Sequence, residues 1–327
     1  MEPRGGIDLG GTKIQAAIVD ADHAVVGADR RPTPTTGGPE DVAQAIGAAL
    51  AAAASEAGLH TATLAGVGIG SPGEIDAASG TVSQARNLPG WEGSFPLGPR
   101  VGELAGVARV AVGNDVDVAT AAEARLGAGR GRDSLLGVFW GTGVGGGIVL
   151  GGRPWAGRGA AGEIGHVVVR IGGRHCPCGR RGCMEAYAGR AAMEARARKL
   201  VDEGHHTKLF HLMEKHGRDR LTSGIWSRAL DHDDKLTREL LDEAVDALGA
   251  GIASAANLLD VEAIILGGGL GLRLGEPFRA RIEAAMMPHL FSDEDPPDLL
   301  LAELGDLGGA LGAALLVDDR APARADG

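Results

Sequence analysis

The chain has 327 residues and a formal net charge of −11, and 44% of its residues are hydrophobic. This length suffices for two domains with their own cores, whereas the acidic balance and an aromatic content of 3% argue against a nucleic-acid binder. No apolar run is long enough to span a bilayer, and the start, MEPRGGIDLGGTK, lacks the apolar core of a signal peptide. The sequence therefore predicts a cytoplasmic protein without nucleic-acid or membrane partners.

The first part of the chain mixes strands with helices. Residues 5–19 predict a strand, a Gly-Gly turn and a second strand, because Ile14, Ala16 and Ile18 recur with a period of two. An Ala-rich helix at 39–57, strands at 64–70 and 107–112, and a helix at about 116–126 are expected to follow.

The second part repeats this theme and then becomes mainly helical. Residues 134–150 again predict a strand, a Gly/Thr turn and a strand. A long helix at 235–260, a buried strand in 261–270, a strand at 299–301, a helix at 306–317 and a disordered tail at 319–327 complete the chain. Two similar glycine hairpins among strands and helices indicate an α/β protein of two related lobes.

Three glycine turns are candidate phosphate cradles, since a turn without Cβ atoms lets backbone N–H groups approach a phosphate. The first turn adds a hydroxyl from Thr12, a cation from Lys13 and a carboxylate, Asp8, that could hold magnesium. Each turn could equally be a simple hairpin turn, but three of them could together enclose one nucleotide. The candidate residues are Asp8, Gly10, Gly11, Thr12 and Lys13; Thr142 and Gly143; and Gly267, Gly268 and Gly269.

The only three cysteines, Cys176, Cys178 and Cys183, lie within eight residues. Such a cluster favours a metal site over three reduced thiols or a redox pair, and zinc prefers four Cys and His ligands. We take His166 as the fourth ligand and His175 as the second choice, because His175 is adjacent to Cys176. A closed four-ligand site of this kind would be structural.

Carboxylates stand close to this cluster and after a predicted strand. Glu163 and Glu185 flank the cysteine loop; a pair of carboxylates could serve glycoside hydrolysis, but binding of sugar hydroxyls agrees better with the phosphate turns. Asp115 follows the strand at 107–112 and could act as a general base with Asn114 orienting the substrate, or either residue could simply cap the next helix.

Together these motifs resemble the ROK family of sugar kinases and repressors, within the actin-like ATPase superfamily. DLGGTK, GTGVGGGIV and GGGL resemble its phosphate and adenosine motifs, and GEIGH followed by CPCGRRGCME resembles its zinc loop of one His and three Cys. NLPGW, at 87–91, is similar to a sugar-contact loop of ROK glucokinases. The resemblance covers about residues 5–316.

The resemblance implies a two-lobed actin-like ATPase (ribonuclease H-like) fold with its active site in the cleft between the lobes. One lobe would comprise 1–114 plus a helix at about 305–318, and the other 115–304. It also implies ATP-dependent phosphorylation of a hexose, most readily glucose at its 6-hydroxyl, with Mg²⁺, a structural Zn²⁺ and a homodimeric or homotetrameric assembly. The sugar would meet Gly73, Asn87, Asn114, Asp115, Glu163, His166 and Glu185, with Asp115 as base.

Other functions stay open at this point. A ROK kinase could act on N-acetylmannosamine, N-acetylglucosamine, fructose or mannose, or use a donor such as polyphosphate. A sugar-sensing regulator is disfavoured, because ROK repressors carry a DNA-binding segment before the first strand and this sequence has four residues before Gly5. A filament-forming actin relative would have no use for the sugar and zinc residues. Residues 201–223 match no family feature, and their histidines are expected on a solvated helical surface.

Overall fold

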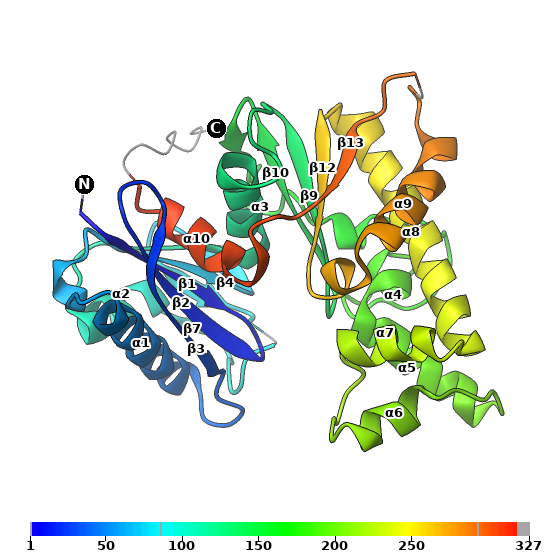
Figure 1. Ribbon diagram of the computed structural model, residues 1–327, viewed down its shortest axis with the longest axis horizontal. Helices are drawn as coiled ribbons and strands as arrows, with labels where there is room; N and C mark the ends of the chain where they lie inside the picture. Colours follow the sequence, from blue (N-terminus) through cyan, green and yellow to red (C-terminus); the bar gives the residue numbers. More distant parts are fainter. Residues whose placement is uncertain (1, 86, 293, 319–327) are drawn as a thin grey trace. The chain divides into compact units, whose positions relative to one another are not determined.

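A computed structural model describes residues 2–85, 87–292 and 294–318 (Figure 1). The chain folds as two units: Met1–Gly131, Gly151–Gly159 and Glu303–Gly327 form the first, and Arg132–Leu150 and Ala160–Ala302 the second. The first unit extends past the expected boundary at residue 114, because helix α3 (Asp115–Leu126) packs against the C-terminal helix α10 (Gly308–Leu315). The predicted tail at 319–327 lies outside the described residues.

The first unit is built on a sheet with the strand order β3-β2-β1-β4-β8. The predicted hairpin is confirmed, since β1 pairs with β2 in antiparallel orientation across the Gly-Gly turn. Strands β1, β4 and β8 are parallel, so their carboxyl ends lie at one edge, where open α/β sheets place their binding sites. The strands are β1 (Arg4–Leu9), β2 (Lys13–Val19), β3 (Val25–Pro32), β4 (Val67–Ser71) and β8 (Val110–Asn114).

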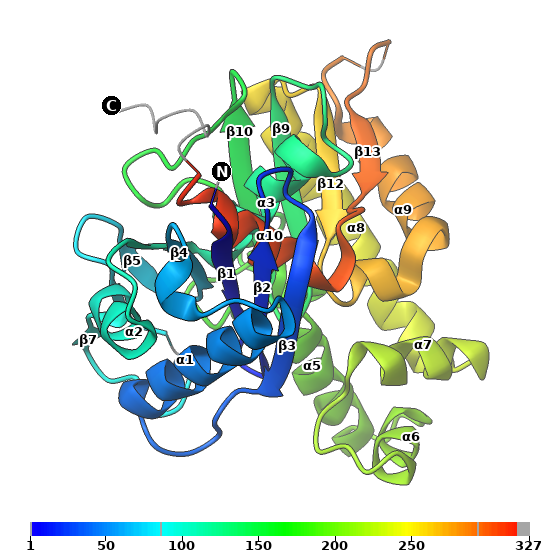
Figure 2. The same ribbon diagram turned by 60° about the vertical axis from the view of Figure 1, so that its left-hand side comes forward.

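Helices cover this sheet on two faces. Helix α1 (Pro39–Glu56) lies along β2 and β3 (Figure 2), and its Ile46 and Leu50 join Ile7 and Ile14 in one apolar core. Helix α10 packs against β1 and β4. Its backbone approaches so closely that a Cβ on Gly68 would lie 1.7 Å from the carbonyl oxygen of Ala313.

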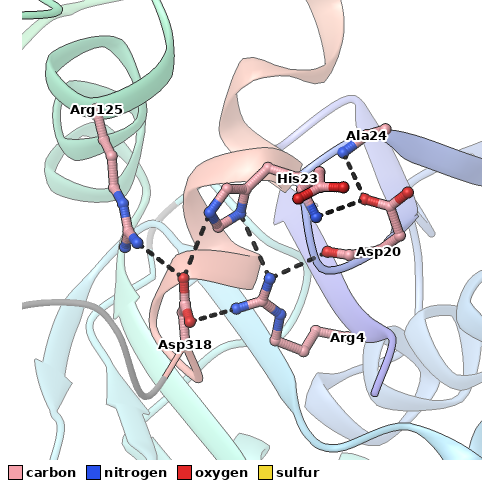
Figure 3. A network of polar contacts seen from close by, with 7 residues as sticks. Arg4, Asp20, His23, Ala24, Arg125 and Asp318 are labelled. Atoms are coloured by element: carbon pink, nitrogen blue, oxygen red, sulfur yellow. Dashed lines mark hydrogen bonds and ion pairs between the residues drawn. The ribbon is translucent and has the colours of Figure 1, made fainter. Parts of the chain in front are cut away.

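A buried ionic network fixes the end of α10 (Figure 3). The fully buried carboxylate of Asp318 lies 2.6 Å from an Arg4 nitrogen on β1 and 3.0 Å from an Arg125 nitrogen on α3. His23 approaches the same carboxylate at 3.5 Å. Three basic side chains from separate elements therefore hold the C-terminal segment in place.

The second unit repeats the order of the first, with β10-β9-β12-β13 corresponding to β2-β1-β4-β8. Strand β9 pairs with β10 as an antiparallel hairpin, and β12 is parallel to both β9 and β13. The prediction of two related lobes is therefore confirmed at the level of strand order. The strands are β9 (Leu135–Trp140), β10 (Val144–Leu150), β12 (Ala263–Gly267) and β13 (Asp298–Leu301).

Helices make up most of the rest of this unit. The predicted long helix is α8 (Lys235–Leu259), which begins where the Asp234 side chain accepts a hydrogen bond from the Thr237 N–H. Residues 201–223 include α6 (Leu209–Lys215). The four histidines of this stretch are exposed, as predicted, but only His211 lies on a helix. The other helices of the unit are α4 (Glu185–Ala188), α5 (Arg190–Asp202), α7 (Ser223–Asp231) and α9 (Gly271–Met286).

No helix in the described ranges has the length and apolar character needed to cross a membrane.

Several short elements were not predicted. The short elements are α2 (Leu97–Ala105), β5 (Glu74–Asp76), β6 (Thr81–Ser83), β7 (Ser94–Phe95), β11 (Arg153–Pro154), and the 3₁₀ turns η1 (Thr61–Thr63), η2 (Ile164–His166), η3 (Met287–His289) and η4 (Gly305–Leu307).

Candidate functional site

The first glycine turn is tight and lies against the predicted sugar loop. The Gly10 N–H donates to the Lys13 carbonyl oxygen at 2.9 Å and closes the turn. A Cβ on Gly11 would lie 2.8 Å from the Asn87 carbonyl oxygen, so only glycine allows this approach. The first unit thus brings the turn and Asn87 together, while the exposed Thr12 hydroxyl remains accessible.

Asp8, the next-to-last residue of β1, carries a poorly solvated carboxylate. Burial raises its pKa, and the Lys13 cation partly opposes that shift. No described residue donates a hydrogen bond to this carboxylate, which leaves its oxygens available for a hydrated cation. The donor chemistry therefore fits Mg²⁺, which prefers oxygen ligands and retains much of its water.

Lys13 is placed by a residue far away in the sequence. Its Nζ lies 3.3 Å from an oxygen of Asp306, whose other oxygen lies 3.2 Å from Arg30. Asp306 precedes α10 and was not predicted as part of the site. Because 293 positions separate Lys13 from Asp306, no local pattern could have revealed the pair.

Asn114 ends β8 at the carboxyl edge of the first sheet, and Asp115 begins α3. Asn114 caps α3, since its Oδ1 accepts hydrogen bonds from the N–H groups of Val116 at 3.0 Å and Asp117 at 3.3 Å. The capping alternative is therefore confirmed for Asn114, whose side-chain NH₂ remains available as a donor. Asp115 Oδ1 also accepts from the Val116 N–H, at 3.0 Å.

Asp115 has the pKa of a group that titrates near neutrality. Desolvation of the half-buried side chain raises the pKa of its carboxyl to about 7, and the nearby charge of Asp8 adds to the shift. Asp8 pairs with Gly70 across β1 and β4, and a Cβ on Gly70 would lie 3.5 Å from the Asp115 Cα. The two carboxylates therefore lie at the same edge of the sheet, on either side of the end of β4, and a carboxyl with such a raised pKa is a candidate functional group.

Gly73 lies just after β4 in a conformation that favours glycine. Its φ is +98°, and a Cβ there would lie 2.5 Å from the Ser83 carbonyl oxygen. This residue therefore exposes only backbone groups to a ligand.

In the second unit the other two glycine turns adjoin each other. The N–H of Leu270 donates to the Trp140 carbonyl oxygen at 2.9 Å, and a Cβ on Gly268 would lie 2.5 Å from the same oxygen. Thr142 and Gly143 lie in the turn after β9, which Trp140 ends. Gly267 ends β12, and Gly269 is exposed. Parallel pairing of β9 with β12 is what brings the two turns to one edge.

Arg190 braces the second turn and was not predicted. Its guanidinium donates to the Thr142 hydroxyl at 2.8 Å and to the Ser223 hydroxyl at 3.1 Å. Burial, together with the neighbouring Arg220 charge, lowers its pKa. A lone arginine at a helix start carries no motif, so only the fold identifies it.

The predicted metal ligands converge. His166, Cys176, Cys178 and Cys183 each offer an atom, and these atoms all lie within 4.8 Å of one another. His175 is outside this group and instead forms a β-bridge with Arg181. The loop closes because Gly182 has a φ of +81°, and a Cβ there would collide with the Arg170 carbonyl oxygen at 1.8 Å.

The spacing of these atoms fits a tetrahedral ion. The sulfur atoms of Cys178 and Cys183 are 3.7 Å apart, and Cys176 Sγ lies 3.6 Å from His166 Nδ1. A tetrahedral zinc ion with bonds of about 2.3 Å to sulfur and about 2.0 Å to nitrogen places two sulfur ligands about 3.8 Å apart and a sulfur and a nitrogen ligand about 3.5 Å apart. The cluster can therefore hold a metal ion with little rearrangement.

The predicted sugar-binding side chains of this unit gather around the loop. His166 turns Nδ1 to Cys176 and places Nε2 3.7 Å from Glu163. Glu185 begins α4 directly after the loop, and its Oε2 accepts the Val144 N–H at 2.9 Å. The second unit thus brings together the cysteine loop, the carboxylates Glu163 and Glu185, and the turn at Thr142.

Comparisons with known proteins agree over nearly the whole chain. The family model described as ROK family matches residues 4–320. A glucokinase of Halalkalibacterium halodurans is 34% identical over 95% of this chain and 94% of its own, and an N-acetylgalactosamine kinase of Shewanella sp. is 34% identical over 95% of each. The crystal structure of a ROK family glucokinase from Streptomyces griseus in complex with glucose and AMPPNP is 34% identical and covers 96% of this chain and 98% of its own, with a TM-score of 0.80. The α/β fold of this chain is that of the ROK sugar kinases, with their actin-like ATPase architecture, and the chain belongs to the ROK family.

Proposed function

We propose that this chain is an ATP-dependent hexose kinase that phosphorylates the 6-hydroxyl of glucose. The observation that carries the proposal is Asp115: a half-buried carboxylate with a pKa raised to about 7, near Asp8 at the carboxyl edge of the sheet. Full-length similarity to glucokinases supports the same reaction.

Asp115 acts as the general base. It takes the proton of the 6-hydroxyl while that oxygen forms its bond to the γ-phosphorus, and the bond from phosphorus to the β-γ bridging oxygen breaks to release ADP. The high pKa suits this role, because a carboxylate that titrates near neutrality accepts a proton more strongly than an ordinary aspartate. The hydrogen bond from the Val116 N–H to Oδ1 holds the direction of its side chain.

Phosphate binding falls to backbone and cationic groups. The turns that contain Gly10 and Gly11 and Thr142 and Gly143 offer N–H groups to the phosphate oxygens, and Gly267, Gly268 and Gly269 make room for the adenosine. Asp8, with Lys13 nearby, would hold hydrated Mg²⁺, which would supply positive charge to the phosphates. Positioning and electrostatics supply most of the rate acceleration in such transfers.

Sugar recognition rests on groups that bond small hydroxyls. Glu163 and Glu185 accept hydrogen bonds from the sugar, and Asn114 donates through its NH₂ group. Asn87 and the backbone at Gly73 add further contacts to the sugar. His166 contributes the ring nitrogen that faces away from Cys176.

The cysteine cluster holds one structural zinc ion. His166, Cys176, Cys178 and Cys183 would complete its four-coordinate shell and leave no position for a reactive water. With the ion bound, His166 would keep one tautomer, and the loop between Glu163 and Glu185 would keep its path. Zinc therefore serves sugar binding and not the phosphoryl transfer.

Kinases of N-acetyl sugars are the strongest alternative, because a relative with that activity is as similar to this chain as the glucokinase is. Polyphosphate as donor, a homodimeric or homotetrameric state and a cytoplasmic location remain predictions.

A coupled assay of ADP release over a panel of hexoses tests the proposal. We expect Mg²⁺- and ATP-dependent turnover with glucose, and its loss in Asp115→Asn. Absence of turnover with every sugar, in protein that binds glucose, would instead favour a sugar-sensing regulator.

A further inference from the structure

One buried polar side chain in the first unit has no partner and no role in the proposed mechanism. Gln15 lies in β2 with 3% of its surface exposed, yet its Oε1 accepts no hydrogen bond from any described residue. Burying an amide oxygen without a partner destabilises a fold by about 1–3 kcal/mol. An apolar side chain would fill this position without that cost. The unpartnered amide oxygen therefore indicates that a ligand or a water molecule binds there.

The strand register places Gln15 beside Asp8. The two residues are directly paired across β1 and β2, and paired side chains of this kind share a face with Cβ atoms about 5 Å apart. Lys13, two residues earlier on the same face of β2, interacts with Asp8 electrostatically. Gln15 therefore extends the row of groups that contains the predicted magnesium carboxylate.

Neighbours on the other side do not satisfy the amide. Arg30 is paired with Gln15 across β2 and β3, but its guanidinium lies at Asp306, 3.2 Å from the carboxylate. Helix α10 covers Asp8, and a Cβ on Gly309 would lie 2.8 Å from the Asp8 Cγ. The buried amide and the unbonded carboxylate are thus the two polar groups of this row left without hydrogen bonds among the described residues.

We propose that the Gln15 amide oxygen accepts a hydrogen bond from a water molecule of the magnesium shell at Asp8, and so positions the ion that accompanies the nucleotide. The inference rests on the proposed function, in which Asp8 holds the ion. Magnesium retains several of its waters in such sites, and neutral oxygen acceptors orient them. Gln15 is a positioning residue that acts through the ion and does not touch the sugar.

Gln15→Met separates the functional role from a merely structural one. Methionine is of similar length and removes the unpartnered oxygen, so in EDTA the melting temperature should equal or exceed that of the wild type, by up to about 4 °C. The Mg²⁺ concentration for half-maximal turnover should rise about tenfold. A variant that is at least as stable but needs more magnesium would not result from a packing defect.

Gln15→Glu tests which atom matters. Glutamate keeps an acceptor oxygen and loses the amide donor, so magnesium dependence should stay near that of the wild type. A second carboxylate beside Asp8 should lower the melting temperature in EDTA and enlarge the stabilisation that Mg²⁺ with ADP confers. Gln44→Met, at an exposed position of α1, is the matched control and should behave as the wild type in each measurement.

The outcomes distinguish this inference from the proposed function. A Gln15→Met protein with wild-type magnesium dependence overturns the inference, whatever its melting temperature. A Gln15→Glu protein that needs more magnesium than Gln15→Met also overturns it, because the amide would then act as a donor. If the wild type itself shows no Mg²⁺-dependent turnover with any sugar, the proposed function fails first.

Discussion

Glu185 accepts a hydrogen bond from the backbone N–H of Val144 at 2.9 Å, and this bond links the end of the cysteine loop to the second glycine turn. Gly143, which precedes Val144, leaves room for the same carboxylate: a Cβ on Gly143 would lie 2.2 Å from Glu185 Oε2. A predicted sugar-binding carboxylate and a predicted phosphate turn therefore depend on each other's position.

Gly143→Ala should displace Glu185 and impair sugar binding from a distance. The added methyl group cannot share space with Oε2, so the carboxylate must rotate away from Val144 and lose its orientation. We expect kcat/KM for glucose to fall at least about tenfold, the loss of one hydrogen bond to a charged group. Steady-state kinetics with glucose varied at saturating ATP measures the effect.

Gly38→Ala is the control for this substitution, because a Cβ there meets no atom within 4 Å and its φ of −150° suits any residue. It should leave the kinetics unchanged. Equal losses in both variants, or none in Gly143→Ala, would contradict the coupling.

Asp115→Asn should abolish turnover while glucose binding survives. Loss of a general base lowers the rate by about 10²–10⁴-fold. For the wild type, kcat/KM should rise with pH through about 7, since the base must be ionised. The midpoint of the kcat profile should lie at a lower pH than that of kcat/KM, because bound magnesium offsets the Asp8 charge that helps to raise the pKa of Asp115. A mutant near the wild-type rate would leave helix capping as the only function of this segment.

The same carboxyl predicts a pH-dependent change in stability. Its pKa rises from 3.8 in the unfolded chain to about 7 in the fold, so between these values the folded protein holds a proton that the unfolded chain releases. The protonated Asp115 carboxyl therefore makes its full stabilising contribution to the free energy of unfolding below pH 3.8. This contribution is lost as the pH rises through 7. Asp115→Asn should gain stability relative to the wild type over this window, as urea titrations at pH 5 and pH 8 would measure.

One tightly bound zinc ion per chain is expected on His166, Cys176, Cys178 and Cys183. Metal analysis of protein purified without added zinc checks this, and Cys178→Ser should lose metal together with sugar affinity. His175→Ala, adjacent to the cluster but outside it, should keep both. Fully active wild-type enzyme with clearly less than one zinc ion would contradict the assignment.

Asp318→Ala should be strongly destabilising. Its carboxylate is the buried anion that meets Arg4 and Arg125, and removal of one member of a buried pair costs about 3–5 kcal/mol. Glu239→Ala breaks an exposed pair with Lys235 and should cost less than about 0.5 kcal/mol. Chemical denaturation of both variants measures the difference, and similar values would show that Asp318 does not anchor α10.

The sequence predicts those parts of the molecule that local patterns encode. Both hairpins, the long helix α8 and the convergence of His166 with the three cysteines were expected, because strand period, helical spacing and ligand spacing are local signals. Asp306, Arg190 and Gln15 were missed because their importance arises from pairing across strands or between distant segments. The predicted end of the first lobe at residue 114 differs from the observed unit for the same reason. Contacts between α3 and α10 place α3 in the first unit, and these helices are far apart in sequence.

Substrate choice is the last prediction: glucose should be preferred over N-acetylglucosamine and N-acetylmannosamine. Overall similarity does not decide this, since a glucokinase and an N-acetyl sugar kinase are equally identical to the chain. The side chains gathered around the cysteine loop do favour hydroxyls: Glu163 and Glu185 are acceptors, and His166 presents one ring nitrogen. An N-acetyl group brings a methyl group that gains nothing from them. We expect kcat/KM for glucose to exceed that for either N-acetyl sugar by at least about 100-fold at saturating ATP and Mg²⁺. An N-acetyl sugar that surpasses glucose would overturn the substrate and leave the kinase reaction in place.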